Sequence, residues 1–135
     1  MKNIIFREFN QTDLFEIATI HNKSLPNDFC SKLGHVFLEK YFYKNFINSY
    51  GSIGVVALFQ NKVCGFVTSS PLINYYSLFI KQYWFSVSKF ILFKVIKNPG
   101  FIFFLFDVFL VMLNNNKSFK EHDYELLYIA VDEKF

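Results

Sequence analysis

The sequence predicts an α/β fold, with a mostly antiparallel mixed sheet flanked by helices and a helical hairpin inserted before the fourth strand. Short β-rich runs alternate with stretches whose apolar residues recur every three to four positions. Two of these runs are separated by only three residues, which is typical of an antiparallel hairpin. The chain has 135 residues and 53% of them are apolar, which excludes disorder and predicts a single domain over residues 1–135.

The N-terminal residues predict a strand followed by a helix. Residues 4–9 read Ile-Ile-Phe-Arg-Glu-Phe and suit a short strand. Asp13 and, three residues later, Glu16 have the spacing of a capping box, which opens a helix. We expect this helix to end near Asn22, because Pro26 interrupts the pattern that follows. Its apolar face carries Leu14, Ile17, Ala18 and His21.

A second helical region and a strand pair come next. Apolar residues between positions 29 and 47 repeat at helical spacing, with Gly34 as a break inside the region. Residues 53–59 and 63–69 are rich in β-branched and aromatic residues. The three residues between them include Asn61, which tolerates a positive φ angle, so a tight hairpin turn is expected there.

Residues 73–113 are helical in length and strongly apolar, and Asn98-Pro99-Gly100 divides them into two helices. At about 100° per residue, the first helix gathers Lys89, Lys94 and Lys97 on one arc and apolar residues on the opposite arc, so it is amphipathic. The second helix is apolar all round and should lie buried beneath other elements or against something apolar outside the chain. Residues 124–131 then form the last strand.

The excess of positive charge lies in this inserted segment. The net charge is +3, and residues 75–113 hold four lysines against Asp107, together with 13 of the 29 aromatic residues. Nucleic acid is not an expected partner, because the charge is small and lysine lacks the bidentate geometry of arginine. Three interpretations of the hairpin stay open: it packs on its own sheet, it docks on a membrane surface, or it inserts into the membrane. Asp107 and the short helices argue against insertion.

Cysteine usage and the N-terminus predict a cytoplasmic protein, peripheral to the inner face of the membrane if the hairpin docks there. Cys30 and Cys64 stand 34 residues apart with no Cys-x-x-Cys pair and no histidine at metal-ligand spacing. We therefore expect reduced, buried thiols and no metal site. The first seven residues contain only three consecutive apolar residues beyond Lys2, too few for a signal peptide.

The order and spacing of these elements resemble the first part of the GNAT superfamily of N-acetyltransferases. Residues 5–9 and 12–14 are similar to the family's first strand and to the acidic residue that opens its first helix. Residues 55–66, which end in Val-Cys-Gly-Phe, resemble its central strand pair. Residues 128–135 resemble the fourth strand and its exit, and Leu-Gly followed by Phe-Leu within residues 30–38 is found in some bacterial members.

The resemblance implies acetyl-CoA as co-substrate and the amine of a small molecule as acceptor, with a lipid-linked amine or an amino sugar as candidates. Family members hold the coenzyme A pyrophosphate on a loop that follows the fourth strand. The loop has the pattern Arg/Gln-x-x-Gly-x-Gly/Ala. No glycine occurs after Gly100. We therefore expect an incomplete sheet, a C-terminally truncated domain and a chain that is inactive by itself. The alternative is a non-catalytic fragment or a membrane-surface binding module.

The resemblance also assigns catalytic and cofactor-binding roles along the last strand. Glu125 occupies the place where some members carry a catalytic glutamate, and its alternative is a solvated carboxylate. Simple alternation puts Glu125 on the same face as Leu127, Ile129 and Val131. The backbone that would contact the cofactor and stabilise the oxyanion belongs to Ile129, Ala130 and Val131.

Two further expectations concern an acceptor-binding residue and a partner. His21 stands where members line the acceptor cleft, and its alternative is a surface or packing histidine. Tyr128 is most simply a core aromatic residue. If the sheet is incomplete, the last strand leaves an unpaired edge, which predicts self-association of the chain.

Overall fold

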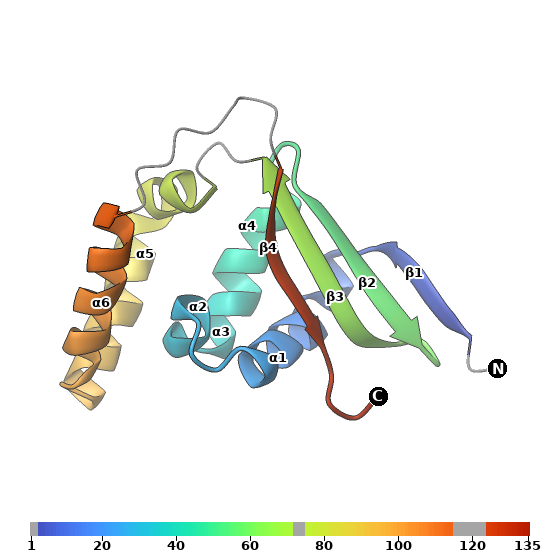
Figure 1. The fold of residues 1–135 in the computed structure, drawn as a ribbon, viewed down its shortest axis with the longest axis horizontal. Helices are drawn as coiled ribbons and strands as arrows, with labels where there is room; N and C mark the ends of the chain where they lie inside the picture. Colours follow the sequence, from blue (N-terminus) through green and yellow to red (C-terminus); the bar gives the residue numbers. More distant parts are fainter. Residues whose placement is uncertain (1–2, 72–74, 115–123) are drawn as a thin grey trace.

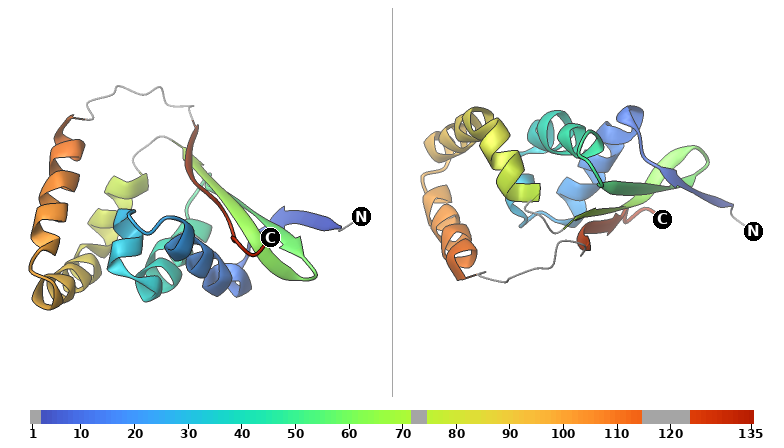
Figure 2. Two further views of the ribbon diagram at one scale, coloured as in Figure 1. Left: turned by 60° about the horizontal axis from the view of Figure 1, so that its bottom comes forward. Right: turned by 90° about the horizontal axis from the view of Figure 1, so that it is seen from above.

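The computed structural model describes residues 3–71, 75–114 and 124–135. Four strands form one antiparallel sheet in the order β1-β2-β3-β4. The first helices cover one face of this sheet, and a helical hairpin lies beyond them (Figures 1 and 2). The predicted α/β class, with an antiparallel sheet flanked by helices, is confirmed.

Within the described residues, every segment predicted as a strand or helix forms one, and residues 73 and 74 of the predicted hairpin lie outside them. The strands are β1 (Ile4–Glu8), β2 (Ile53–Phe59), β3 (Lys62–Pro71) and β4 (Tyr124–Val131). The helical elements are a 3-10 turn η1 (Gln11–Asp13), α1 (Leu14–Ser24), α2 (Phe29–Leu33), α3 (His35–Phe37), a π-helical segment η2 (Leu38–Tyr43), α4 (Lys44–Ile47), α5 (Tyr75–Lys97) and α6 (Phe101–Asn114).

The first helix, α1, begins directly after Asp13, as predicted, and ends at Ser24, two residues beyond the predicted end. The capping box belongs to the 3-10 turn η1 before it and joins Asn10 and Asp13, so the predicted pairing of Asp13 with Glu16 is wrong. Asp13 accepts two hydrogen bonds from the guanidinium of Arg7, at 2.7 and 2.8 Å, and these hold the pKa of its carboxyl below the usual range. Glu16 instead accepts the backbone N–H of Val63 at 3.2 Å, which ties α1 to the sheet.

Two backbone breaks lie where the sequence places them. Gln60 and Asn61 have φ angles of 50° and 63°, which make the tight turn between β2 and β3. Gly34 has a φ of 106°, in a region that L side chains rarely adopt, and it separates α2 from α3. Glycine is therefore required at the junction of the two helices.

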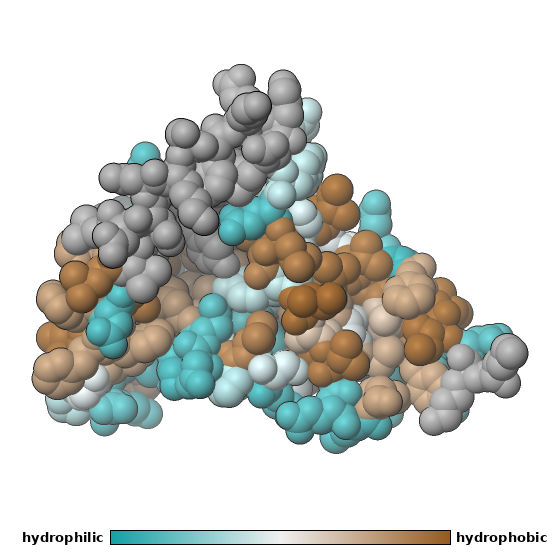
Figure 3. Space-filling view, viewed as in Figure 1, coloured by the Kyte–Doolittle hydropathy of each residue, from teal (hydrophilic) through white to brown (hydrophobic). Residues whose placement is uncertain are grey.

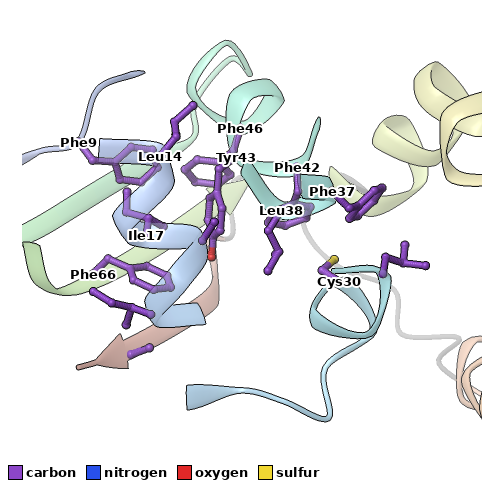
Figure 4. Close-up of a cluster of buried hydrophobic side chains, with 14 of the residues drawn as sticks. Phe9, Leu14, Ile17, Cys30, Phe37, Leu38, Phe42, Tyr43, Phe46 and Phe66 are labelled. Carbon is purple, nitrogen blue, oxygen red and sulfur yellow. The ribbon is translucent and has the colours of Figure 1, made fainter. Parts of the chain in front are cut away.

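Aromatic rings fill the space between the helices and the sheet (Figure 4). The Tyr43 ring centroid lies 5.1 Å from that of Phe42 and 5.7 Å from that of Phe66 on β3, with edge-to-face geometry in both cases. Phe9 stacks on Phe46 at 5.7 Å and closes the end of the core nearest β1. The abundance of phenylalanine therefore reflects a densely aromatic core as well as exposed surface.

The hairpin of α5 and α6 is held by the helical layer. Phe79 and Phe90 on α5 lie edge-to-face with Phe37 of α3, with centroids 5.9 and 5.4 Å apart. Phe90 also contacts Tyr41 of η2 at 5.4 Å. The two helices of the hairpin run side by side at the flank of the molecule (Figures 1 and 2). No described helix is long and apolar enough to cross a membrane.

Candidate functional site

The candidate site lies along the outer edge of β4. Among the described strands, β4 pairs only with β3. The Asp132 N–H donates to the Cys64 carbonyl at 2.8 Å. This bond fixes which residues of β4 direct their backbone groups toward β3, because such residues alternate with residues whose groups point outward. By that alternation the backbone groups of Ala130 point to Phe66 on β3, whereas those of Ile129 and Val131 point away from the sheet. Of the three predicted cofactor contacts, Ile129 and Val131 therefore have outward backbone groups.

The end of α1 flanks this edge. The Ser24 hydroxyl, in the last turn of α1, donates to the Val131 carbonyl at 3.2 Å. The backbone N–H of Val131 and both backbone groups of Ile129 remain directed outward by the ladder alternation. The edge thus presents two N–H donors and one carbonyl acceptor at the spacing of a β-ladder. One more extended segment could pair with them.

A β-bulge interrupts β4 at Leu127. Thr68 pairs with Tyr128, but the next residue of β3, Ser69, pairs with Leu126, so Leu127 has no partner position. The bulge moves Glu125 opposite Ser70, on the same face as Tyr128. The prediction that Glu125 shares a face with Ile129 and Val131 is wrong, because one extra residue reverses the alternation on the far side of the bulge.

Glu125 is exposed near the start of β4. It stands two residues from the bulge at Leu127 and four from Ile129. At roughly 3.3 Å per residue, these separations correspond to about 7 Å and about 13 Å along the strand. Glu125 is therefore near the bulge but remote from the outward groups of Ile129.

His21 lies inside the core with no exposed surface. Its Nε2 is 3.2 Å from Oδ2 of Asp28, and its Nδ1 bonds to the Tyr43 hydroxyl. Its ring also lies 4.4 Å from that of Tyr128 on β4. Both ring nitrogens of His21 therefore have protein partners, and its role in acceptor binding stays a prediction.

Asp28 is the centre of this polar cluster and was missed by the sequence analysis. Its carboxylate accepts from the Tyr128 hydroxyl at 3.0 Å and from the Cys30 N–H at 2.8 Å, in addition to His21. Burial pushes the pKa of Asp28 up, but the hydrogen bonds and the charge of His21 outweigh it, so the pKa lies below its usual range. An aspartate directly before a helix is a capping signal, and it could have identified this residue.

Both cysteines are free and buried, as predicted. Burial raises the pKa of the Cys30 thiol well above its ordinary value, and the nearby Asp28 carboxylate adds to this shift. Cys30 is therefore unsuited to nucleophilic catalysis. Among the described residues, no group of three histidine, cysteine or acidic side chains is arranged to hold a metal ion.

The open edge of β4 predicts concentration-dependent association. Two β4 edges can pair through the outward groups of Ile129 and Val131, whose exposed side chains add apolar contact. We expect the sedimentation coefficient to rise with protein concentration in analytical ultracentrifugation. Ile129→Lys should suppress this rise, because a lysine on an edge strand opposes pairing, whereas Ile53→Lys on the interior strand β2 should have less effect. A strictly monomeric wild type at high concentration would contradict this prediction.

Comparison with known proteins gives only a weak likeness to solved structures. No protein-family pattern matches the chain, and no curated protein is detectably similar to it. An acetyltransferase of the GNAT family from Streptococcus pneumoniae superimposes with a TM-score of 0.38 and 23% sequence identity. The superposition covers 55% of this chain and 48% of that protein, so the match spans about half of each. Likeness at this level does not assign the chain to the family.

Proposed function

We propose that this chain binds acetyl-CoA along the outer edge of β4 and serves the transfer of its acetyl group to the amine of a small molecule. The observation that carries the proposal is the open edge of β4, where the outward backbone groups of Ile129 and Val131 lie next to a bulge at Leu127. The resemblance in the order of sequence elements gives independent support.

The edge suits the chemistry of the pantetheine arm. This arm is extended and carries two amides, so it can add to a sheet edge as a further strand does. In the proposal its amides pair with Ile129 and Val131, which places the thioester near Leu127. A bulge takes its extra residue out of the regular ladder, so a backbone donor there is available to stabilise the oxyanion of the tetrahedral intermediate.

The proposed reaction needs a base beside the bulge. The neutral amine attacks the thioester carbonyl and forms the C–N bond, and the C–S bond then breaks. The departing coenzyme sulfur takes the second proton from the attacking nitrogen and leaves as the thiol. The proton lost by the ammonium goes to the base, for which Glu125 is the candidate. At about 7 Å from Leu127 along the strand, Glu125 can reach the amine through one water molecule.

Affinity for the nucleotide part of coenzyme A is expected to be low. Residues 101–135 contain no glycine, so the described elements include no glycine-rich loop that could hold a pyrophosphate. The proposal therefore predicts that acetyl-CoA and S-acetylpantetheine bind with equal and weak affinity, on the order of millimolar. A preference of a hundredfold or more for acetyl-CoA would show that another segment binds the pyrophosphate.

Proline substitutions on β4 test the edge directly. Ile129→Pro removes an N–H that points outward, so the fold should survive while binding of S-acetylpantetheine weakens about fivefold, since each hydrogen bond contributes roughly 1 kcal/mol. Ala130→Pro removes an N–H that pairs with Phe66 and should destabilise the sheet instead. Saturation-transfer NMR measures binding and urea unfolding measures stability. Unchanged binding by folded Ile129→Pro would contradict the proposed site.

A further inference from the structure

The outer side of α6 is a continuous apolar stripe. At about 100° per residue, the exposed apolar residues between positions 101 and 110 of α6 fall within one arc of roughly 120°, and Asp107 lies at its rim. The opposite arc, which includes Phe101 and Phe104, packs against the rest of the molecule. The exposed residues of the stripe are Ile102, Phe103, Phe106, Phe109 and Leu110.

The exposed side of α5 extends this surface with aromatic, aliphatic and basic residues. Val87, Phe90 and Ile91 face inward, whereas other apolar residues of the helix are exposed. Figure 3 shows apolar residues gathered at the flank formed by the hairpin as well as over the strands. The outward apolar residues of α5 are Trp84, Phe85, Leu92, Phe93 and Ile96. We call these, with the stripe of α6, the hairpin surface.

Lysines are embedded in the hairpin surface. The Lys89 ammonium lies 4.5 Å from the centre of the Phe85 ring, and that of Lys97 lies 4.4 Å from the Phe93 ring. The ion pairs in the described part of the chain involve none of the hairpin lysines. Positive charge is therefore held beside exposed aromatic rings without a described acidic partner.

We propose that the hairpin surface docks on a membrane bearing anionic lipids. Insertion of its aromatic and aliphatic residues below the headgroups buries the apolar stripe, and Lys89 and Lys97 then lie at the level of the lipid phosphates. Exposed Trp84 is typical of this interface, because its ring is apolar and its N–H is polar. The docking surface is separate from the edge of β4 and does not depend on acetyl transfer.

The charge pattern favours a lipid surface over a protein partner. Lysine is depleted from the cores of protein interfaces, but Lys89 lies within the arc of α5 that also exposes Phe85 and Ile96. A second copy packed on the same surface would bring lysines toward lysines, with Asp107 as the acidic residue available between positions 75 and 113. Anionic headgroups satisfy both the charge and the adjacent apolar surface.

Trp84 gives a direct measurement, since it is the one tryptophan in the chain. We would titrate the full chain with phosphatidylcholine vesicles that contain or lack phosphatidylserine. With phosphatidylserine present, the Trp84 emission should shift to shorter wavelength and should be quenched by lipids brominated near the headgroup. The shift should diminish at about 0.5 M salt, where charge screening is strong.

Matched variants separate the electrostatic part of vesicle binding from the apolar part. Lys89→Gln with Lys97→Gln should weaken the partition coefficient about 25-fold, from about fivefold per lysine. The control, Lys62→Gln with Lys134→Gln, removes the same charge from exposed positions outside the hairpin and should have little effect.

Phe103→Ser with Phe106→Ser should weaken binding by about a hundredfold or more. Both side chains are largely exposed, so the fold should persist, as checked by circular dichroism. Phe6→Ser on β1 is the control, because Phe6 is 71% exposed but lies on the sheet.

Three results would overturn the proposal. One is a folded wild type that binds neither type of vesicle. Another is equal binding to both types of vesicle with no effect of the lysine substitutions. The third is a shift of the Trp84 emission that grows with protein concentration in the absence of lipid and is lost in the variant with Phe103→Ser and Phe106→Ser. That result would assign the surface to a second copy of the chain.

Discussion

Replacing Gly54 by alanine is expected to destabilise the protein by about 3 kcal/mol or more. A Cβ atom at Gly54 would lie 1.8 Å from Cε1 of Phe9, far inside van der Waals contact. The Phe9 ring has little room to move, because it stacks on Phe46 and its backbone N–H donates to the Gly54 carbonyl at 3.1 Å. The substitution must therefore displace β2 or expel the ring from the core.

Gly100→Ala is the matched control. An added Cβ at Gly100 meets only Oδ1 of Asn98 within 4 Å, at 3.2 Å, and this amide can turn aside at the cost of one exposed hydrogen bond from the Gly100 N–H. We expect a change of less than about 0.5 kcal/mol. Urea unfolding followed by circular dichroism gives both values, and a Gly54→Ala variant within 1 kcal/mol of the wild type would show that the contact between β2 and Phe9 is looser than the structure indicates.

Asp28→Ala should have the second largest effect, a loss of about 3 kcal/mol of unfolding free energy at neutral pH. The substitution removes the cap of α2 and leaves the buried His21 ring and the Tyr128 hydroxyl without their shared acceptor. Asp132→Ala is a suitable control, because its carboxylate accepts one bond in an exposed turn, from the Lys134 N–H. Equal stabilities for the two variants would contradict a central role for Asp28.

The same carboxylate makes stability depend on pH in a defined direction. Because the pKa of Asp28 is lower in the folded chain than in the unfolded chain, its contribution is fully present above about pH 4 and is lost as the pH falls through the folded value. Asp28→Asn should therefore lose less stability than the wild type between pH 5 and acid pH. Parallel curves of unfolding free energy against pH for the wild type and Asp28→Asn would contradict the assignment of this pH dependence to Asp28.

Local patterns were sufficient to predict the elements of the fold. The turn after β2 and the break at Gly34 each depend on residues that tolerate a positive φ, so they could be found from the sequence. The bulge at Leu127 could not, because alternation assumes that each residue of a strand has one partner. The polar cluster was also hidden, since Asp28 and Tyr128 are 100 residues apart and meet only after the sheet forms.

The direction of the hairpin could not be predicted either. A helix that is apolar all round, such as α6, contains no pattern to show which side faces the core. Its orientation follows instead from α5, where Phe79 and Phe90 contact Phe37. The exposed stripe of α6 is what remains after those contacts are made.

The most direct test of the central claim is an NMR titration of the isotope-labelled chain with S-acetylpantetheine. Binding along the outer edge of β4 predicts that the amide signals of Leu127, Ile129 and Val131 shift together with one dissociation constant. The amide of Ala130, which faces β3, and those of β1 should shift much less. Shifts centred on another part of the molecule, or no shift at millimolar ligand, would contradict the proposed acetyl-CoA site.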